Sequence, residues 1–134
     1  MDRAMRIRIV GPEMLIYEGD AAFVAVPASD GEIGVLPSHS NEIATIRAGY
    51  VRVSDETMGR IDHTFAVLSG YVEIADDAII VLADRAVDLA TVDKDDVSAH
   101  LRDFEDQLDG LESDDAHRAY LYNKISWCKL LLAS

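Results

Sequence analysis

Residues 30–39 read Asp-Gly-Glu-Ile-Gly-Val-Leu-Pro-Ser-His, and this stretch is the most informative part of the sequence. Two glycines and a proline interrupt a short apolar segment, which is typical of a strand that leads into an exposed loop. Loops held on a rigid scaffold often carry the residues that contact partners. The stretch therefore predicts a β domain that presents a recognition loop to solvent.

A period-two alternation extends this prediction through the first two thirds of the chain. Met5, Ile7 and Ile9 fall on one face of a segment whose other face carries Arg6 and Arg8, as expected for a half-buried strand. The same pattern recurs in two later segments, with predicted inward residues Val51, Val53, Ile61, Phe65 and Val67. Many short strands without an intervening helical pattern predict an antiparallel β-sandwich, which we place at residues 1–88.

One tight turn is predicted near the end of this β region. Asp76 and Asp77 lie between the apolar segments 72–74 and 79–82. A two-residue hairpin turn requires residues that tolerate positive φ at this position, and aspartate is one of them. The two segments are therefore expected to pair as a β-hairpin.

The periodicity changes after Asp93. Apolar residues then recur at spacings of four and three, which predicts a helix with one narrow apolar seam, formed by Val97, Leu101, Phe104, Leu108 and Leu111. Gly110 is expected to end this helix, and Ser113, Asp114 and Asp115 to cap a second helix with a broader apolar face. Residues 89–134 are thus expected to form an antiparallel α-helical hairpin, and the fold class is mainly β plus α.

Composition is that of a globular chain and argues against several classes of function. The 134 residues are 49% hydrophobic, which is enough for one real core. The formal net charge of −13 repels phosphate groups, so nucleic acid is not expected as a partner. No segment approaches the ~18 consecutive apolar residues of a membrane helix, so direct membrane insertion is not expected either.

No motif predicts catalysis, a cofactor or a metal site. Ser38 and His39 are adjacent, a spacing at which two side chains seldom meet as nucleophile and base. The four histidines lack the paired spacing of a zinc site, and the acidic residues at 93–96 lack the glycine and glutamate of a calcium loop. Cys128 has apolar neighbours and is expected to be a buried, inert thiol.

Two histidines have different expected roles. His63 is in phase with Ile61 and Phe65, so it is expected to be a core or edge residue with a hydrogen-bond partner. His39 follows Pro37 in a loop. At His39, contact with a partner and local hydrogen bonding within the turn remain equally open.

The stretch 30–39, the segment Val-Leu-Ala-Asp-Arg-Ala at 81–86 and the helical pattern that follows together resemble the epsilon subunit of the bacterial F-type ATP synthase. The resemblance covers nearly the whole chain and is strongest through Ala86. It implies a β-sandwich that binds the gamma subunit of the rotor and touches the polar loops of the membrane-embedded ring. The chain is therefore expected to be a non-catalytic central-stalk subunit that couples gamma to the ring, peripheral at the cytoplasmic face of the membrane.

The resemblance also implies which residues contact these partners. The loop that faces the ring would be 28–32, with tip residues Asp30, Gly31 and Glu32. Its two carboxylates are candidate partners for basic groups. The positions that face gamma would include His39, Ile43 and Ala44.

In relatives, the hairpin can act as a brake on ATP hydrolysis against the catalytic beta subunit, and it can bind ATP. Relatives that bind ATP carry Ile/Leu-Asp-x-x-Arg-Ala at the first helix start, and here Asp96 replaces the arginine. A carboxylate repels a triphosphate, so no useful ATP binding is expected. Because the segment 93–112 is strongly acidic, electrostatic inhibition is expected to be weak or absent.

Two turns depart from the pattern of the family. The usual Pro-Gly-His-Ala-Pro-Leu is Pro-Ser-His-Ser-Asn-Glu at 37–42. The usual Gly-Gly is Ser69-Gly70. Serine thus replaces glycine in both turns, and the resemblance does not imply their geometry.

Two other classes of function remain open. A nucleotide-sensing regulatory module would close its hairpin over a nucleotide, although the missing arginine argues against it. An enzyme of unknown chemistry would need a concave cluster of titratable groups, which the sequence does not show at motif spacing.

Overall fold

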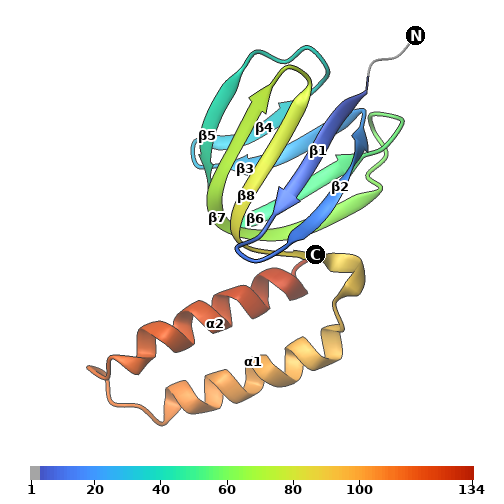
Figure 1. Cartoon of the computed structure of the whole chain (residues 1–134). Helices are drawn as coiled ribbons and strands as arrows, with labels where there is room; N and C mark the ends of the chain where they lie inside the picture. The colour runs from blue at the N-terminus through green and yellow to red at the C-terminus, as the bar shows by residue number, and fades with distance from the viewer. Residues whose placement is uncertain (1–3) are drawn as a thin grey trace. The chain divides into compact units, whose positions relative to one another are not determined.

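The computed structural model describes residues 4–134. Within them the chain forms eight strands, a short 3-10 helix and two α-helices (Figure 1). The strands are β1 (Met5–Val10), β2 (Leu15–Ala21), β3 (Phe23–Ala28), β4 (Gly31–Val35), β5 (Glu42–Ile46), β6 (Gly49–Ser54), β7 (His63–Ala75) and β8 (Ala78–Asp88). The chain divides into two compact units between Ala90 and Thr91.

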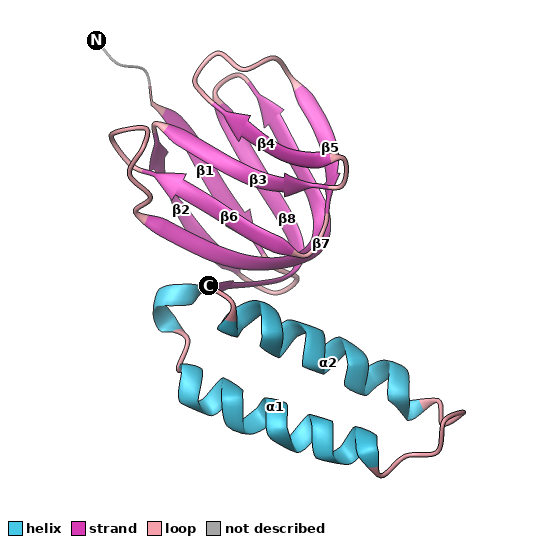
Figure 2. Cartoon of the chain, turned by 180° about the vertical axis from the view of Figure 1, so that it is seen from behind, coloured by secondary structure: helices cyan, strands magenta, loops and turns pink. Residues whose placement is uncertain are grey.

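The β unit is one continuous sheet that folds over on itself as a sandwich (Figure 2). One layer follows the order β2-β1-β8-β7-β5, and the other contains β4, β3, β6 and the first part of β7. The pairing of β1 with β8 is parallel, and the other pairings between described strands are antiparallel. The predicted β-sandwich is therefore confirmed, with one parallel pair that the alternation could not predict.

The alternation predicts the core well. Met5, Ile7 and Ile9 are buried, whereas Arg6 and Arg8 on the opposite face are exposed. Four further predicted inward residues are fully buried, namely Val51, Val53, Phe65 and Val67.

The prediction for Ile61 is wrong, because this side chain is 44% exposed and lies before β7. A turn in which the Arg60 amide donates to the Thr57 carbonyl delays the strand until His63. The strand therefore begins two residues later than the period-two pattern of 61–67 predicts. His63 is half-buried, and its predicted hydrogen bond is present, since Nε2 lies 3.0 Å from Asp55 Oδ2.

The strand β7 passes from one layer to the other at Gly70, and β8 pairs with β7 on both sides of this position. Residues before this position pair with β6, and residues from Gly70 onward pair with β5. Gly70 has φ +134°, and a Cβ there would overlap the carbonyl oxygen of Leu82. The crossing of the strands therefore requires glycine at this position.

The predicted tight turn between β7 and β8 is confirmed. Asp76 and Asp77 have φ of 52° and 60°, and the flanking residues Ala75 and Ala78 pair with each other. Positive φ at both central residues is the geometry that favours a two-residue hairpin, because its twist matches that of the strands.

The second unit is a hairpin of two helices, α1 (Lys94–Asp109) and α2 (His117–Leu132). Asp93 caps α1 by accepting hydrogen bonds from the amides of Asp95 and Asp96, and Gly110 follows its last residue. Cys128 is buried on α2, as predicted. Across residues 4–134, no helix combines the length and the apolar character needed to cross a membrane.

The expected cap of the second helix is present at Asp115, but the expected acidic first turn is not. The residue directly before α2 is Ala116, which offers no side-chain cap, and the first turn of α2 holds no acidic residue. Asp115, one residue earlier, accepts a hydrogen bond from the His117 amide at 2.8 Å with its carboxylate and one from the Arg118 amide at 3.1 Å with its carbonyl. It therefore satisfies two amides at the start of α2, as a capping residue does.

Candidate functional site

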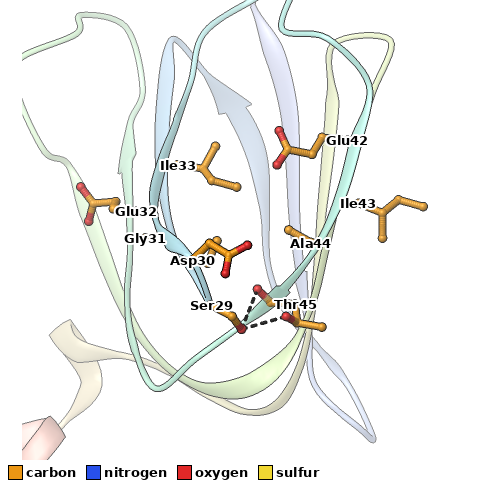
Figure 3. A pocket seen from close by; sticks show the side chains of 10 residues that line it. Ser29, Asp30, Gly31, Glu32, Ile33, Glu42, Ile43, Ala44 and Thr45 are labelled. Carbon is orange, nitrogen blue, oxygen red and sulfur yellow. Dashed lines mark hydrogen bonds between the residues drawn. The ribbon is translucent and has the colours of Figure 1, made fainter.

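Five of the six predicted partner-binding residues line one surface hollow of about 470 Å³ (Figure 3). The end of β3, the turn at 29–30 and the start of β4 form one wall, and β5 forms the other. The hollow thus joins the predicted ring-facing tip to two of the predicted gamma-facing positions. The five residues are Asp30, Gly31, Glu32, Ile43 and Ala44.

The closed end of the hollow is held by Ser29 and Thr45. The Ser29 amide donates to the Thr45 carbonyl at 2.9 Å. The Ser29 hydroxyl lies 2.8 Å from the Thr45 hydroxyl and donates to the same carbonyl at 3.3 Å (Figure 3). Ala28 and Ile46 pair beside them. Beyond this point β4 and β5 separate, and no pairing joins them in the described chain.

The mouth of the hollow is acidic. Asp30, Glu32 and Glu42 are exposed there. Glu32 forms an exposed ion pair with Arg52, Nη1 to Oε2 at 3.2 Å, whereas Asp30 and Glu42 form no ion pair with any residue between 4 and 134. The net negative charge favours a partner that brings basic groups.

The walls of the hollow are partly apolar. Ile33 and Ala44 are half-buried on its two sides, and the Ile43 side chain is 73% exposed. A large aliphatic group this exposed on a rigid strand costs hydration free energy that a partner can recover by covering it. The hollow therefore combines exposed carboxylates with partly apolar walls.

The sixth predicted residue, His39, lies outside the hollow. It is half-buried, and its Nδ1 donates to the carbonyl of Ser40 at 2.6 Å. The loop that carries it is anchored to the β7–β8 turn, because the Ser38 amide donates to Asp77 Oδ1 at 2.6 Å. The local hydrogen bond of His39 is thus present, and its contact with a partner stays a prediction.

Two exposed apolar residues were not predicted from the sequence. Tyr71 on β7 is 57% exposed and pairs with Thr45 on one side and with Leu82, 46% exposed, on the other. These residues share the outer face of the layer that carries Ile43, since paired residues point to the same side. The sequence signal for these two residues was an apolar side chain at a position where the period-two alternation of the strand predicts an outward side chain.

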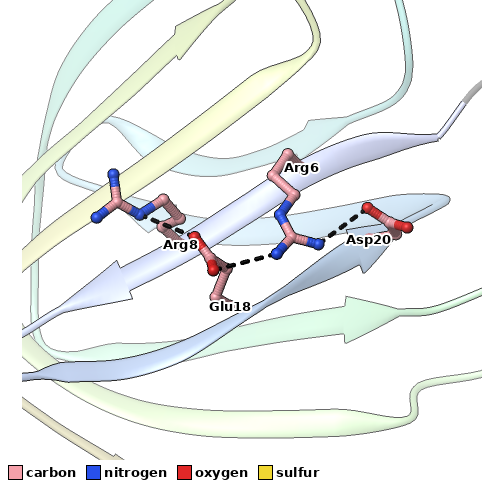
Figure 4. Close-up of polar contacts among 4 residues, drawn as sticks. All are labelled: Arg6, Arg8, Glu18 and Asp20. Atoms are coloured by element: carbon pink, nitrogen blue, oxygen red, sulfur yellow. Dashed lines mark hydrogen bonds and ion pairs between the residues drawn. The ribbon is translucent and has the colours of Figure 1, made fainter.

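The same outer face continues into an ion-pair cluster on β1 and β2 (Figure 4). Glu18 lies between Arg6 and Arg8 at 3.1 and 3.2 Å, and Arg6 also contacts Asp20 at 3.2 Å. The hydrogen bond to Asp20 is the main cause that raises the pKa of Arg6. These charges neutralise each other, so this end of the face offers a partner little net charge.

A second polar cluster surrounds His63. The Tyr17 ring lies 5.0 Å from the His63 ring, and Asp55 contacts His63. Burial raises the pKa of Tyr17, and the Asp55 carboxylate adds to this shift. A raised pKa keeps the phenol neutral and makes it a poor nucleophile. Across residues 4–134, no cluster of histidine, cysteine and acidic side chains is suited to hold a metal ion.

The described chain is thus a β-sandwich with an acidic, partly apolar hollow on its surface, followed by a helical hairpin. Residues 4–89 match the family described as ATP synthase, Delta/Epsilon chain, beta-sandwich domain. The chain belongs to this family.

Its relatives are epsilon chains of bacterial ATP synthases. The chain is 36% identical over 111 residues to the ATP synthase epsilon chain of Rhodopseudomonas palustris (strain TIE-1), with 83% of this chain and 80% of the relative covered. It is 32% identical over 108 residues to the ATP synthase epsilon chain of Rhodospirillum rubrum, with 81% and 79% covered. The expected family is therefore confirmed.

Two solved structures share the fold. A chain of the Euglena gracilis mitochondrial ATP synthase, in a structure of OSCP, F1 and c-ring, superposes with a TM-score of 0.75 at 18% identity, covering 99% of this chain and 82% of that chain. A chain of the Tetrahymena thermophila mitochondrial ATP synthase, from a structure of the central stalk and c-ring, gives a TM-score of 0.57 at 12% identity, covering 98% and 96%.

Proposed function

We propose that this chain is a non-catalytic central-stalk subunit of a bacterial F-type ATP synthase, and that its β-sandwich joins the gamma subunit to the rotor ring. Its role is mechanical, because a stiff connection lets torque from the ring reach the catalytic head without slip. Family membership supports the assembly. The observation that carries the proposal is the hollow whose lining includes both an acidic tip and an exposed isoleucine.

The hollow suggests how the two contacts divide. Asp30, Gly31 and Glu32 lie at the turn and the start of β4, where the carboxylates of Asp30 and Glu32 reach solvent and can meet basic groups of the ring. Ile43 and Ala44 lie across the hollow on β5 and would face gamma, together with His39 in the next loop. One rigid sheet then carries both contacts, which is what transmission of torque requires.

The hairpin has a secondary role in this proposal. It would approach the catalytic beta subunit and would inhibit ATP hydrolysis weakly or not at all. The exposed carboxylates of α1, among them Asp95, Asp96 and Asp103, repel an acidic surface and a triphosphate alike. The chain would lie at the cytoplasmic face of the membrane and would touch the lipid phase only through its partners.

Charge reversal at the tip tests the proposed coupling. The double variant Asp30→Lys with Glu32→Lys should let the assembled enzyme hydrolyse ATP while ATP-driven ion pumping into membrane vesicles falls several-fold. The physical reason is that like charges would then face the basic groups of the ring.

A matched control carries the same change of charge elsewhere. Glu13→Lys with Glu56→Lys alters two exposed carboxylates outside the hollow and should leave pumping per ATP unchanged. Equal pumping by both double variants would contradict the proposed role of the acidic tip.

A further inference from the structure

The free edge of β4 has main-chain groups that the sandwich does not use. Pro27 accepts a hydrogen bond from the Arg47 amide, so the Pro27 carbonyl points away from β4 and toward β5. Successive residues of a strand point their main-chain groups to opposite edges. The neighbours of Pro27, Val26 and Ala28, therefore bond to β4, where their partners are Ile33 and Gly31.

The main-chain groups of the β4 residues that alternate with these partners therefore point away from β3. The N–H and C=O groups of Glu32 and Gly34 face the free edge of β4, and no described strand pairs with that edge. Glu32 is exposed and lines the hollow, and Gly34, also exposed, has no side chain to obstruct an approaching strand.

The opposite wall shows a similar opening. Thr45 accepts from the Ser29 amide, so its main-chain groups face the hollow, and those of Ile43, two residues earlier, point the same way. The hollow thus lies between the edges of β4 and β5, and at its closed end β5 hydrogen-bonds to the end of β3 and to Ser29. An exposed pair of edges is a template for an added strand.

The carboxylates around the hollow favour a basic segment over a second copy of this chain. A second copy of this chain would bring another Asp30, Glu32 and Glu42 to the same edge, in a molecule with a net charge of −13. Like charges on an edge are a device that prevents edge-to-edge pairing of identical chains. A basic segment finds attraction at the same place, because Asp30 and Glu42 lack ion-pair partners between residues 4 and 134.

We propose that an extended basic segment of a partner subunit adds as a strand to the free edge of β4. Its main chain bonds to Glu32 and Gly34, the basic side chains on one face of the added strand meet Asp30 and Glu32, and the aliphatic side chains on the other face enter the hollow beside Ile33 and Ala44. This inference deepens the proposed function, since it states how the acidic tip holds its partner.

Binding of short peptides to the full chain tests the proposal by NMR. The probe is the acetylated and amidated peptide Lys-Val-Arg-Val-Lys, and the control is Glu-Val-Asp-Val-Glu. The basic peptide should shift the amide signals of Glu32 and Gly34 and slow their hydrogen exchange by about threefold or more. The Ile33 and Val35 amides, which already face β3, serve as internal controls. The acidic peptide should produce no shift.

N-methylation identifies the mode of binding without altering the protein. One version of the basic peptide is methylated at both valine nitrogens, and the other at the arginine and second lysine nitrogens. A strand that adds through one edge tolerates one of these versions and loses binding with the other. Equal binding of both versions would show that side chains alone hold the peptide and would overturn the proposal.

Two variants separate charge from main-chain bonding. Glu32→Gln should weaken binding by about fivefold or less, the effect of one exposed ion pair. Glu32→Pro also removes the outward N–H, which an edge strand tolerates, and should weaken binding further. Circular dichroism checks that both variants keep their strands. If the basic peptide does not bind, or perturbs residues away from β4, the inference fails, whereas copurification of gamma and the ring with the intact chain would still support the proposed function.

Discussion

Two serines hold backbone conformations that glycine adopts more easily. Ser38 and Ser69 have φ of 68° and 35°, and both stand where the family pattern has glycine. Each is held by a hydrogen bond to a neighbouring strand or turn. The Ser38 amide donates to Asp77 Oδ1, and the Ser69 hydroxyl donates to Asp84 Oδ2 at 2.6 Å. The turns thus keep positive φ although the residue type has changed, because these bonds offset the cost of the conformation.

Gly70 is the residue for which a substitution should cost most. Gly70→Ala places a methyl group against the Leu82 carbonyl at φ +134°, so we expect a loss of ~3 kcal/mol or more in the free energy of unfolding. Urea unfolding followed by the circular dichroism of the strands measures this loss.

The matched control is Gly59→Ala. Gly59 has φ +104°, but a Cβ there meets no atom within 4 Å, so only backbone strain of ~1–2 kcal/mol is expected. Equal losses for the two variants would show that the contact with Leu82 does not decide the requirement for glycine.

Tyr17 makes stability depend on alkaline pH. Its pKa is raised above the ordinary value of 10.0, first by burial and then by Asp55. The stability that the neutral phenol contributes is therefore complete below pH ~10 and is lost as pH rises through the higher folded-state pKa. Tyr17→Phe keeps the ring contacts and removes the titration. We expect its urea midpoint to fall less than that of the wild type between pH 9 and pH 11.

An exposed tyrosine provides the comparison for this experiment. Tyr71→Phe alters a phenol that is 57% exposed, and it should leave the alkaline loss of the wild type in place. A Tyr17→Phe variant with an unchanged alkaline loss would contradict the assignment to Tyr17.

At the scale of elements, α1 depends on its cap. Asp93 Oδ1 accepts from the amides of Asp95 and Asp96 at 2.9 and 3.3 Å, and α1 has no fully buried residue of its own. Asp93→Ala should therefore destabilise α1 by ~1 kcal/mol, visible as faster hydrogen exchange in its first turns. Asp114→Ala removes the same charge from a residue that caps no helix, and it should leave that exchange unchanged. Similar effects of both variants would point to charge rather than capping.

The elements that the sequence predicts well are those with local signals. The alternation at Met5, Ile7 and Ile9, the pair Asp76-Asp77 and the glycine at 110 each report on neighbours close in sequence. The late start of β7 was missed, because the turn in which the Arg60 amide donates to the Thr57 carbonyl leaves no trace in the apolar pattern.

The candidate site shows the same limit. Asp30 and Ile43 could be proposed from the family pattern, but no sequence signal places them in one hollow. That arrangement depends on where β4 and β5 separate after Ser29 and Thr45. Tyr71 and Leu82 were missed because exposure of an apolar residue depends on sheet order rather than on its own type.

At the scale of the whole molecule, the acidic hairpin should not control hydrolysis. A chain that ends before Val92 loses both helices, and its β unit keeps the hollow. We expect ATP hydrolysis by the assembled enzyme to stay close to that of the intact chain, because an acidic α1 makes a poor electrostatic brake. Steady-state hydrolysis at equal enzyme concentration measures this. A several-fold rise on truncation would contradict the expectation.

The central claim is that this chain physically connects gamma to the rotor ring. The most direct measurement is copurification from its own cell through an affinity tag on the intact chain. The claim predicts that gamma, the ring subunits and the catalytic subunits are recovered with it in constant proportion. Recovery of the folded, tagged chain without gamma and the ring would contradict the claim.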